Sequence, residues 1–463
     1  MIHYNNETNN NNNYNSMEEP KFQSRRDFLK KLSLFAGSGL LMTAAPGITF
    51  SEALQDKKES ANGRIRLGII GVGSRGRYHV LVLNNIPNVE ITAVCDNYPP
   101  HYERAKELTN GKAEAYWDYR ELLEKNKPDA VLIATPLHEH AHITIDALKS
   151  GCHVLCEKSM AKTIDDSIAM VKAQKETGKI LFVGHQRKFD VKYLKAKQMV
   201  DNGFFPKITQ IRAWWHRNND WRRPVPENNF PNHPNWELDP QYPTLEHKIN
   251  HRLYRKYSRG LMTELASHQI HIANWFMHKL PISVSGSGGI NYWHDGREVF
   301  DNVNLVYKYP GGVNVIYDSM TSNKQYSLEE QIMGPKGTFE LEKGKYFHES
   351  PPPAPGILQM INEIEHQIFD NVPLGGKSWI PESAADTSGK YFLDEYPLPN
   401  STQLQNEAFL ESVRNNKIVP GLAEEYLYAT IASLMGDQAM MNNEVVYWPE
   451  DKLTVLDQFN KQK

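Results

Sequence analysis

The sequence predicts an α/β protein: a doubly wound parallel sheet, followed by an α+β domain with an open, mainly antiparallel sheet. Closely spaced glycines directly follow a short β-branched run at residues 65–70, as at the first turn of a parallel sheet. Strand-like and helix-like runs then alternate to about residue 187, which is typical of a parallel sheet. Residues 282–341 contain mainly strand-like runs, two of them separated by a hairpin turn at Pro310-Gly311-Gly312.

The glycines after the first run predict a dinucleotide site. Gly71, Gly73 and Gly76 have GxGxxG spacing, which permits a tight turn, close approach of backbone N–H groups to a pyrophosphate, and close packing of a helix at about 75–85 on the strand. A second run at 90–95 ends in Asp96, which can accept hydrogen bonds from a ribose 2′-OH and would repel a 2′-phosphate. We therefore expect a Rossmann domain that prefers NAD to NADP; the alternative is a merely structural βαβ turn.

The rest of the first domain continues this alternation. We expect helices at 98–109, 118–126 and 138–150, and strands at 130–133, 153–156 and 180–184. His138, His140 and His142 do not predict a metal site, because only the first and third share a helix face; a structural or nicotinamide-side role is favoured. Lys158 follows a buried strand at the carboxyl edge of the sheet, where ligands bind, although a solvated lysine at a helix start is the alternative.

Composition limits the possible partners of the protein, and the N-terminal residues predict its localisation. A net charge of −3 argues against nucleic acid as the main partner, and three cysteines without paired spacings are expected to be core residues. Residues 1–16 are rich in asparagine and expected to be disordered, with the start at Met1 or Met17 open. Ser24 to Lys31 has a twin-arginine pattern before a short apolar run at 32–45, which predicts export to the periplasm in folded form; the alternatives are an amphipathic arm and a cytoplasmic protein.

The second half is expected to carry the substrate site. A helix at 192–202 and a strand at 208–215 precede a long loop at 216–243, and long loops at a crevice carry specificity. Tryptophans at the end of the strand and in the loop could stack on sugar faces, and arginines of the loop could bond hydroxyls or a carboxylate; ordinary packing at the surface is the alternative. These residues are Trp214, Trp215, Trp221, Trp236, Arg217, Arg222 and Arg223.

Residues 260–276 form the predicted chemical centre of this half. Glu264 and His268 have i, i+4 spacing, so the carboxylate is expected to orient the imidazole and raise its pKa, unless the two are only a surface pair. Further strands are expected at 284–288, 303–309, 313–318 and 337–341, a proline-rich excursion at 351–400 with a short helix at 361–368, and helices at 403–415 and 424–442.

Several motifs resemble the Gfo/Idh/MocA oxidoreductase family: GVGSRG at 71–76, ATPLHEH at 134–140 and CEKSMAKT at 156–163, with the similarity extending to about residue 449. Two positions depart from the family pattern, Ser159 in place of a proline and Glu264 in place of an aspartate. The resemblance implies that the cofactor contacts Gly71, Gly73, Ser74, Arg75, Gly76, Asp96, Thr135, Pro136, His138, His140, Glu157, Lys158 and Gln186.

The expected activity is hydride transfer from a secondary alcohol of a sugar, glycoside or cyclitol to NAD. His268 is expected to act as general acid/base, Lys158 to polarise the oxygen and Glu264 to orient, with Arg217, Trp221 and Arg222 also contacting substrate. A redox-neutral NAD-dependent glycosidase or lyase is the alternative, and a binding protein without catalysis is a third. We expect domains at 1–60 (leader and linker), 61–187 (NAD-binding) and 188–463 (substrate), and a homodimer or homotetramer formed through the second sheet.

Overall fold

The computed structural model describes residues 63–349, 388–393 and 397–454. The asparagine-rich leader, the twin-arginine pattern, the linker at 51–62 and the helix expected at 361–368 lie outside these residues, as does most of the proline-rich excursion. Within the described ranges, no helix has both the length and the apolar character needed to cross a membrane.

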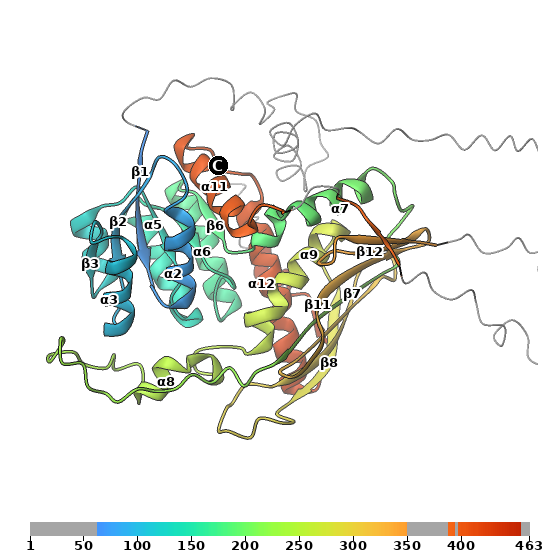
Figure 1. Ribbon diagram of the computed structural model, residues 1–463. Helices are drawn as coiled ribbons and strands as arrows, with labels where there is room; N and C mark the ends of the chain where they lie inside the picture. The colour runs from blue at the N-terminus through green and yellow to red at the C-terminus, as the bar shows by residue number, and fades with distance from the viewer. Residues whose placement is uncertain (1–62, 350–387, 394–396, 455–463) are drawn as a thin grey trace, which may run out of the picture.

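The first sheet has six parallel strands in the order β3-β2-β1-β4-β5-β6, which confirms the doubly wound prediction. Its central strands are apolar and almost entirely buried, as expected for a sheet covered by helices on both faces (Figure 1). The strands are β1 (Ile65–Ile70), β2 (Val89–Cys95), β3 (Glu114–Tyr116), β4 (Ala130–Ile133), β5 (His153–Cys156) and β6 (Leu181–Val183).

The helices expected at 75–85, 98–109, 118–126 and 138–150 lie near their predicted limits, whereas α6 was not predicted. Thr163 caps α6 by accepting a hydrogen bond from Asp166 N, and Gly178, with a φ of 66°, ends it. The helices are α2 (Ser74–Leu83), α3 (Pro99–Leu108), α4 (Tyr119–Glu121) with the π-helical turn η2 (Leu122–Asn126), the short η3 (Leu137–Glu139), α5 (His140–Lys149), α6 (Ile164–Thr177) and η4 (Gln186–Phe189).

The described residues of the second sheet form nine strands in the order β14-β13-β12-β11-β7-β10-β9-β8-β15, and among these the β7–β10 pair alone is parallel. The hairpin predicted at Pro310-Gly311-Gly312 joins β9 to β10. The strands are β7 (Gln210–Asn218), β8 (Ser283–Gly289), β9 (Asn302–Lys308), β10 (Asn314–Met320), β11 (Ser322–Gly334), β12 (Gly337–Glu340), β13 (Lys345–His348), β14 (Lys390–Tyr391) and β15 (Val446–Tyr447).

The helices of the second half connect the two sheets. Helix α12 packs against α9 and β8 on one side and α6 and β6 on the other (Figure 1). Helix α11 returns to the first domain, where Gln405 donates to Val183 O at 2.7 Å. The helices are α7 (Val191–Asp201), α8 (Leu245–Ile249), η5 (His251–Leu253), the π-helical turn η6 (Met262–Ala266), α9 (Ser267–Met277), α11 (Ser401–Arg414) and α12 (Leu422–Asn442).

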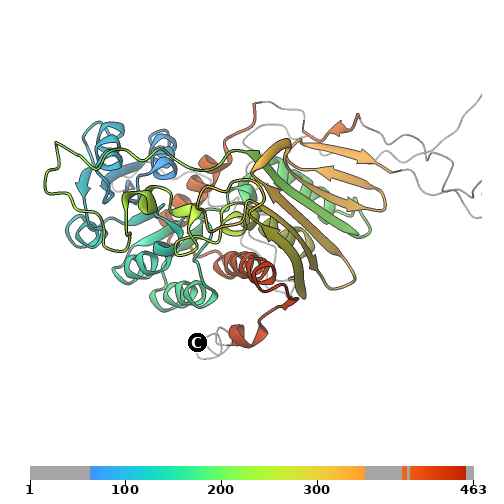
Figure 2. The ribbon, with the colours of Figure 1, turned by 90° about the horizontal axis from the view of Figure 1, so that it is seen from below.

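Residues 219–257, called the arm below, leave β7 and extend along the first domain (Figures 1 and 2). Trp236 Nε1 donates to Asn97 O at 2.9 Å, and His233 pairs with Glu103 at 2.8 Å. Phe230 and Trp236 pack edge-on against Tyr98. The loop predicted at 216–243 therefore covers the nucleotide domain as well as bordering a crevice.

Candidate active site

The glycine turn between β1 and α2 has the geometry that a dinucleotide requires. Gly71 has a φ of 83°, and its N–H donates to Cys95 O at 2.8 Å. A Cβ on Gly76 would lie 2.0 Å from Gly71 O, so only glycine allows α2 to start this close to the strand. A Cβ on Gly73 would meet only the His101 ring, at 3.4 Å, which leaves the turn open toward the cavity.

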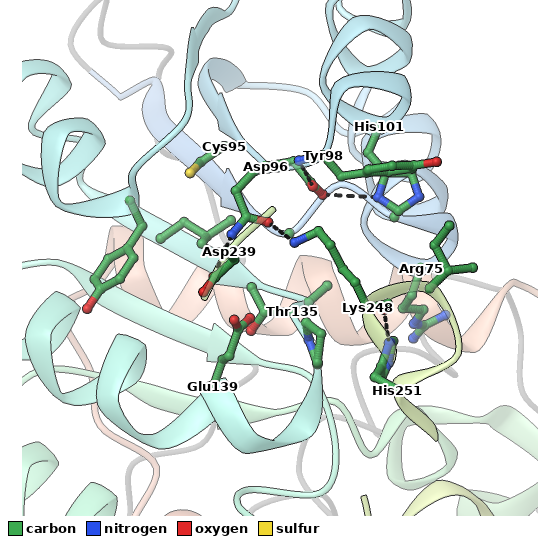
Figure 3. A pocket seen from close by; sticks show the side chains of 18 of the residues that line it. Arg75, Cys95, Asp96, Tyr98, His101, Thr135, Glu139, Asp239, Lys248 and His251 are labelled. Carbon is green, nitrogen blue, oxygen red and sulfur yellow. Dashed lines mark hydrogen bonds and ion pairs between the residues drawn. The ribbon is translucent and has the colours of Figure 1, made fainter. Parts of the chain in front are cut away.

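Asp96 directly follows β2 and is held at the rim of this turn. Its carboxylate accepts hydrogen bonds from Val72 N at 2.9 Å and Tyr98 N at 3.0 Å, and pairs with His101 Nδ1 at 3.3 Å (Figure 3). Burial would raise the pKa of Asp96, but the hydrogen bond and charge of His101, with the charge of Lys248, lower it overall. The side chain is therefore an anionic acceptor where a ribose hydroxyl would lie.

A cavity of about 1040 Å³ extends from the glycine turn and is lined by both the first domain and the arm (Figure 3). Seven of the predicted cofactor residues line it: Gly71, Gly73, Ser74, Arg75, Asp96, Thr135 and Pro136. Arg75 Nη2 and Thr135 Oγ1 are buried there without a hydrogen-bond partner among the described residues, so they are available to a ligand. The cavity fits a dinucleotide with its phosphates at the N-terminus of α2.

The arm supplies cavity residues that the sequence did not identify. Asp239, Gln241, Lys248 and His251 line the cavity, and Figure 3 shows Lys248 and His251 close to Arg75. Asp239 accepts from Asn97 Nδ2 at 3.0 Å, and Gln241 donates to Glu139 at 2.7 Å, which fixes the arm on the nucleotide domain. Thr244 caps α8 by accepting a hydrogen bond from His247 N. A threonine directly before the first residue of a helix is the sequence pattern that indicates where this helix begins.

A second cavity of about 480 Å³ adjoins the first, and Arg75, Thr135 and Pro136 line both. Six of the residues predicted to contact substrate line it: Lys158, Arg217, Trp221, Arg222, Glu264 and His268. His140, Glu157 and Gln186, expected at the cofactor, line this cavity only. The predicted nicotinamide-side residues and the predicted substrate residues thus meet in one place.

Lys158 projects from the end of β5 toward the turn η6. Its Nζ donates to Glu264 O at 2.8 Å and to Thr263 O at 3.4 Å, and the Lys158–Ser159 peptide bond is cis. Burial lowers the pKa of Lys158, while the carboxylates of Glu264 and Glu157 act in the opposite direction. The ammonium is held by backbone carbonyls, which leaves a donor for a substrate oxygen.

His268 lies 5% exposed beside Trp215, at 6.0 Å between ring centroids, and beside His185 at 5.6 Å. Burial, followed by the charges of Lys158 and Arg187, lowers the pKa of His268 well below its usual value. The expectation that Glu264 raises this pKa is therefore wrong. A neutral imidazole at neutral pH is the state that accepts a proton.

Glu264 does not orient His268. Its carboxylate pairs with Arg252 at 3.0 Å and accepts from Ser258 Oγ at 3.1 Å, while His268 Nδ1 has no hydrogen-bond partner among the described residues. Glu264 lies in the π-helical turn η6, and its carboxylate is taken by Arg252, which the arm brings to this wall of the cavity.

Glu157 lies in the wall of the second cavity. It accepts from Arg75 Nε at 2.7 Å and pairs with His79 at 2.8 Å. Burial would raise the pKa of Glu157, but the charge of Arg75 and the hydrogen bond from His79 hold it far below its usual value. A Cβ on Gly184 would lie 2.6 Å from Glu157 Oε2, so β6 also shapes this position.

Four sequence-based assignments are corrected by the geometry. Gly76 lies under the turn against Gly71 and lines neither cavity. His138 bonds Gln241 Oε1 at 2.7 Å and packs on Tyr257, away from both linings. Trp214 points to the other face of β7, with Nε1 donating to Tyr326 O, and Trp236 packs on the nucleotide domain instead of the substrate cavity.

Comparisons with known proteins agree with this architecture. The protein-family model described as "Oxidoreductase family, NAD-binding Rossmann fold" matches residues 65–185. The family model of the GFO/IDH/MocA C-terminal domain matches residues 193–340. Myo-inositol 2-dehydrogenase of Thermotoga maritima is 26% identical over 276 residues, 59% of this chain and 74% of the relative.

Two further proteins are similar. Bacillus subtilis scyllo-inositol 2-dehydrogenase (NAD(+)) is 25% identical over 62% of this chain and 76% of its own. A structure of scyllo-inositol dehydrogenase from Lactobacillus casei with bound NAD(H) and scyllo-inositol superposes with a TM-score of 0.59 and 20% identity, covering 83% of this chain and 99% of that one. At this identity the superposition shows the fold.

Proposed function

The chain belongs to the Gfo/Idh/MocA oxidoreductase family, and on that premise we propose that it is an NAD-dependent dehydrogenase acting on a secondary alcohol of a cyclitol or sugar. The observation that carries the proposal is the junction of the two cavities: the dinucleotide cavity opens at Thr135 and Pro136 into a cavity that holds Lys158 and His268. A substrate carbon and a nicotinamide ring can meet there.

When bound, NAD supplies the hydride acceptor. Side chains of the protein take up the hydroxyl proton and stabilise the charge on the hydroxyl oxygen. His268, neutral because of its burial, takes the hydroxyl proton as general base. The Lys158 ammonium, fixed by the carbonyls of Thr263 and Glu264, donates to the same oxygen and stabilises its developing negative charge. Glu264 keeps Arg252 in place at the cavity wall.

The experiment is a spectrophotometric assay with a panel of inositols, monosaccharides and sugar acids, in the presence of NAD or NADP. The proposal expects NAD reduction by at least one member and a lower rate with NADP, because Asp96 would repel a 2′-phosphate. A panel that reduces neither cofactor contradicts the dehydrogenase, and a preference for NADP contradicts the role given to Asp96.

The arm supports a second candidate, a redox-neutral hydrolase or lyase that retains its NAD. Trp236 and His233 fix the arm over the first domain, and Lys248 and His251 line the cofactor cavity from the arm. A cofactor enclosed in this way would dissociate slowly. Release of aglycone from glycosides without net NAD reduction, by protein that keeps NAD through dialysis, would favour this candidate.

We also infer association through the outer face of the nine-stranded sheet. Trp214, Ile316 and Val306 project from this face, opposite to the side chains that pack on the helices, and Val306 is 36% exposed. Light scattering should give a dimer or tetramer; the mass of a single chain of 53.1 kDa would contradict it.

Export by the twin-arginine route stays a proposal, supported by the Ser24 to Lys31 pattern and the apolar run after it. Fractionation of cells that carry the full chain, compared with an Arg25→Lys/Arg26→Lys double variant, tests it. Equal amounts of both proteins in the periplasmic fraction would contradict this route.

A further inference from the structure

The substrate cavity holds more positive charge than its own carboxylates neutralise. Six cationic side chains line it: Arg75, Lys158, Arg217, Arg222, Arg223 and Arg252. The carboxylates in the lining are Glu157, which pairs with Arg75 at 2.7 Å, and Glu264, which pairs with Arg252 at 3.0 Å. Two carboxylates outside the lining, Glu246 and Asp295, pair with Arg222.

Lys158, Arg217 and Arg223 remain. Lys158 is held by the backbone carbonyls of Thr263 and Glu264. Among the described residues, neither Arg217 nor Arg223 has a carboxylate within ion-pair distance, although each is only partly exposed. Burial and the nearby charge of Arg252 lower the pKa of both guanidinium groups, so an uncompensated positive field exists at this wall. A desolvated cation without a partner is costly, and such groups are typical of anion sites.

Arg217 is placed by the strand. Along β7, Ala213, Trp215 and Arg217 share the face directed to the helices, while Arg212, Trp214 and His216 share the other. The Arg217 guanidinium lies 5.0 Å from the centroid of the Trp215 ring, a cation–π contact that uses none of the N–H groups a carboxylate would bind.

Arg223 lies at the junction of the cavities and lines both of them. Asn250 fixes its backbone through two hydrogen bonds, of 2.7 and 3.0 Å. Arg217 lines the substrate cavity and does not line the cofactor cavity. The cofactor phosphates can therefore neutralise Arg223, whereas Arg217 needs an anion that belongs to the substrate.

We propose that the substrate is a sugar acid, whose single carboxylate binds Arg217 while its secondary hydroxyl meets Lys158 and His268. This inference rests on the proposed dehydrogenase function and names its substrate class. A monosaccharide acid is also the size that a cavity of about 480 Å³ accepts, and one unpaired arginine matches one negative charge better than the two of a phosphate.

The test compares matched neutral and acidic substrates with the NAD-loaded protein: glucose with glucuronate, galactose with galacturonate, and glucose 6-phosphate as the phosphate alternative. We expect kcat/KM to be at least about tenfold higher for the acid than for the neutral sugar of each pair. Arg217→Gln should lower kcat/KM for the acid by about 10- to 100-fold and should change kcat/KM for the neutral sugar little. Arg217→Lys should restore part of the preference. Arg64→Gln, at an exposed position directly before β1 that lines neither cavity, is the control and should leave both values unchanged.

Three outcomes overturn the inference: neutral sugars turned over faster than their acids, equal losses for both in Arg217→Gln, or a preference for the phosphate. If neutral sugars reduce NAD and acids do not, the dehydrogenase stands and only the inference fails. If no sugar reduces NAD, calorimetric binding of the two acids and the two neutral sugars to the NAD-loaded protein decides. Acids that bind no more tightly than the neutral sugars, or bind equally well to Arg217→Gln, then refute the inference.

Discussion

Alanine at Gly73 and alanine at Gly76 should separate cofactor binding from folding, although both lie in the same turn. A Cβ at Gly76 would lie 2.0 Å from Gly71 O and 3.0 Å from Gly71 C, both backbone atoms, so the turn must move by more than 1 Å. A Cβ at Gly73 would lie 3.4 Å from the His101 ring, an ordinary contact, and Gly73 has a φ of −61° that alanine adopts freely.

The expected magnitudes follow from these distances. Forcing a methyl group into packed backbone costs about 1–3 kcal/mol, and a melting temperature shifts by about 2–4 °C for each kcal/mol in domains of this size. Gly76→Ala should therefore lower the melting temperature by about 2–12 °C. Gly73→Ala should leave it within about 1 °C, yet weaken NAD binding by at least about tenfold, because its methyl group would project into the cofactor cavity.

Thermal unfolding by circular dichroism and calorimetric titration with NAD measure the two effects on the same samples. NAD binding by Gly73→Ala at the wild-type affinity would refute the placement of the pyrophosphate at this turn. An unchanged melting temperature for Gly76→Ala would refute the close approach of α2 to β1.

Lys158→Met and His268→Ala should each lower kcat by about 10²- to 10⁴-fold while NAD affinity by titration stays within about threefold, and lost NAD binding would make these residues structural. Glu264→Gln should cost less, since its carboxylate contacts Arg252 and Ser258. Burial lowers the pKa of His268 below 6.5, so kcat should stay level as pH falls through 6.5 and decline only at lower pH; a midpoint at or above 6.5 would contradict this. Asp96→Ala should narrow the NAD preference, measured as kcat/KM for both cofactors.

Local patterns in the sequence determined the nucleotide half. Apolar runs such as Ile65–Ile70 and Ala130–Ile133 indicate strands buried on both faces, and glycine spacing indicates the turn between the first strand and its helix. The position of Lys158 also followed from the sequence, because a residue after a parallel strand lies at the carboxyl edge of the sheet. By contrast, the sequence did not predict β11. The first half of this strand is polar and exposed, and its residues do not alternate clearly between apolar and polar.

Only the tertiary structure decided how distant segments meet. Trp236 lies 139 residues from Asn97 along the chain, and nothing near either residue indicates that the arm returns to the nucleotide domain. The helix containing Glu264 and His268 was predicted, but its π-helical turn was not, because periodicity assumes a constant number of residues per turn. Sequence periodicity reports local backbone geometry, whereas the partner of a charged side chain, here Arg252 for Glu264, depends on which segments pack together.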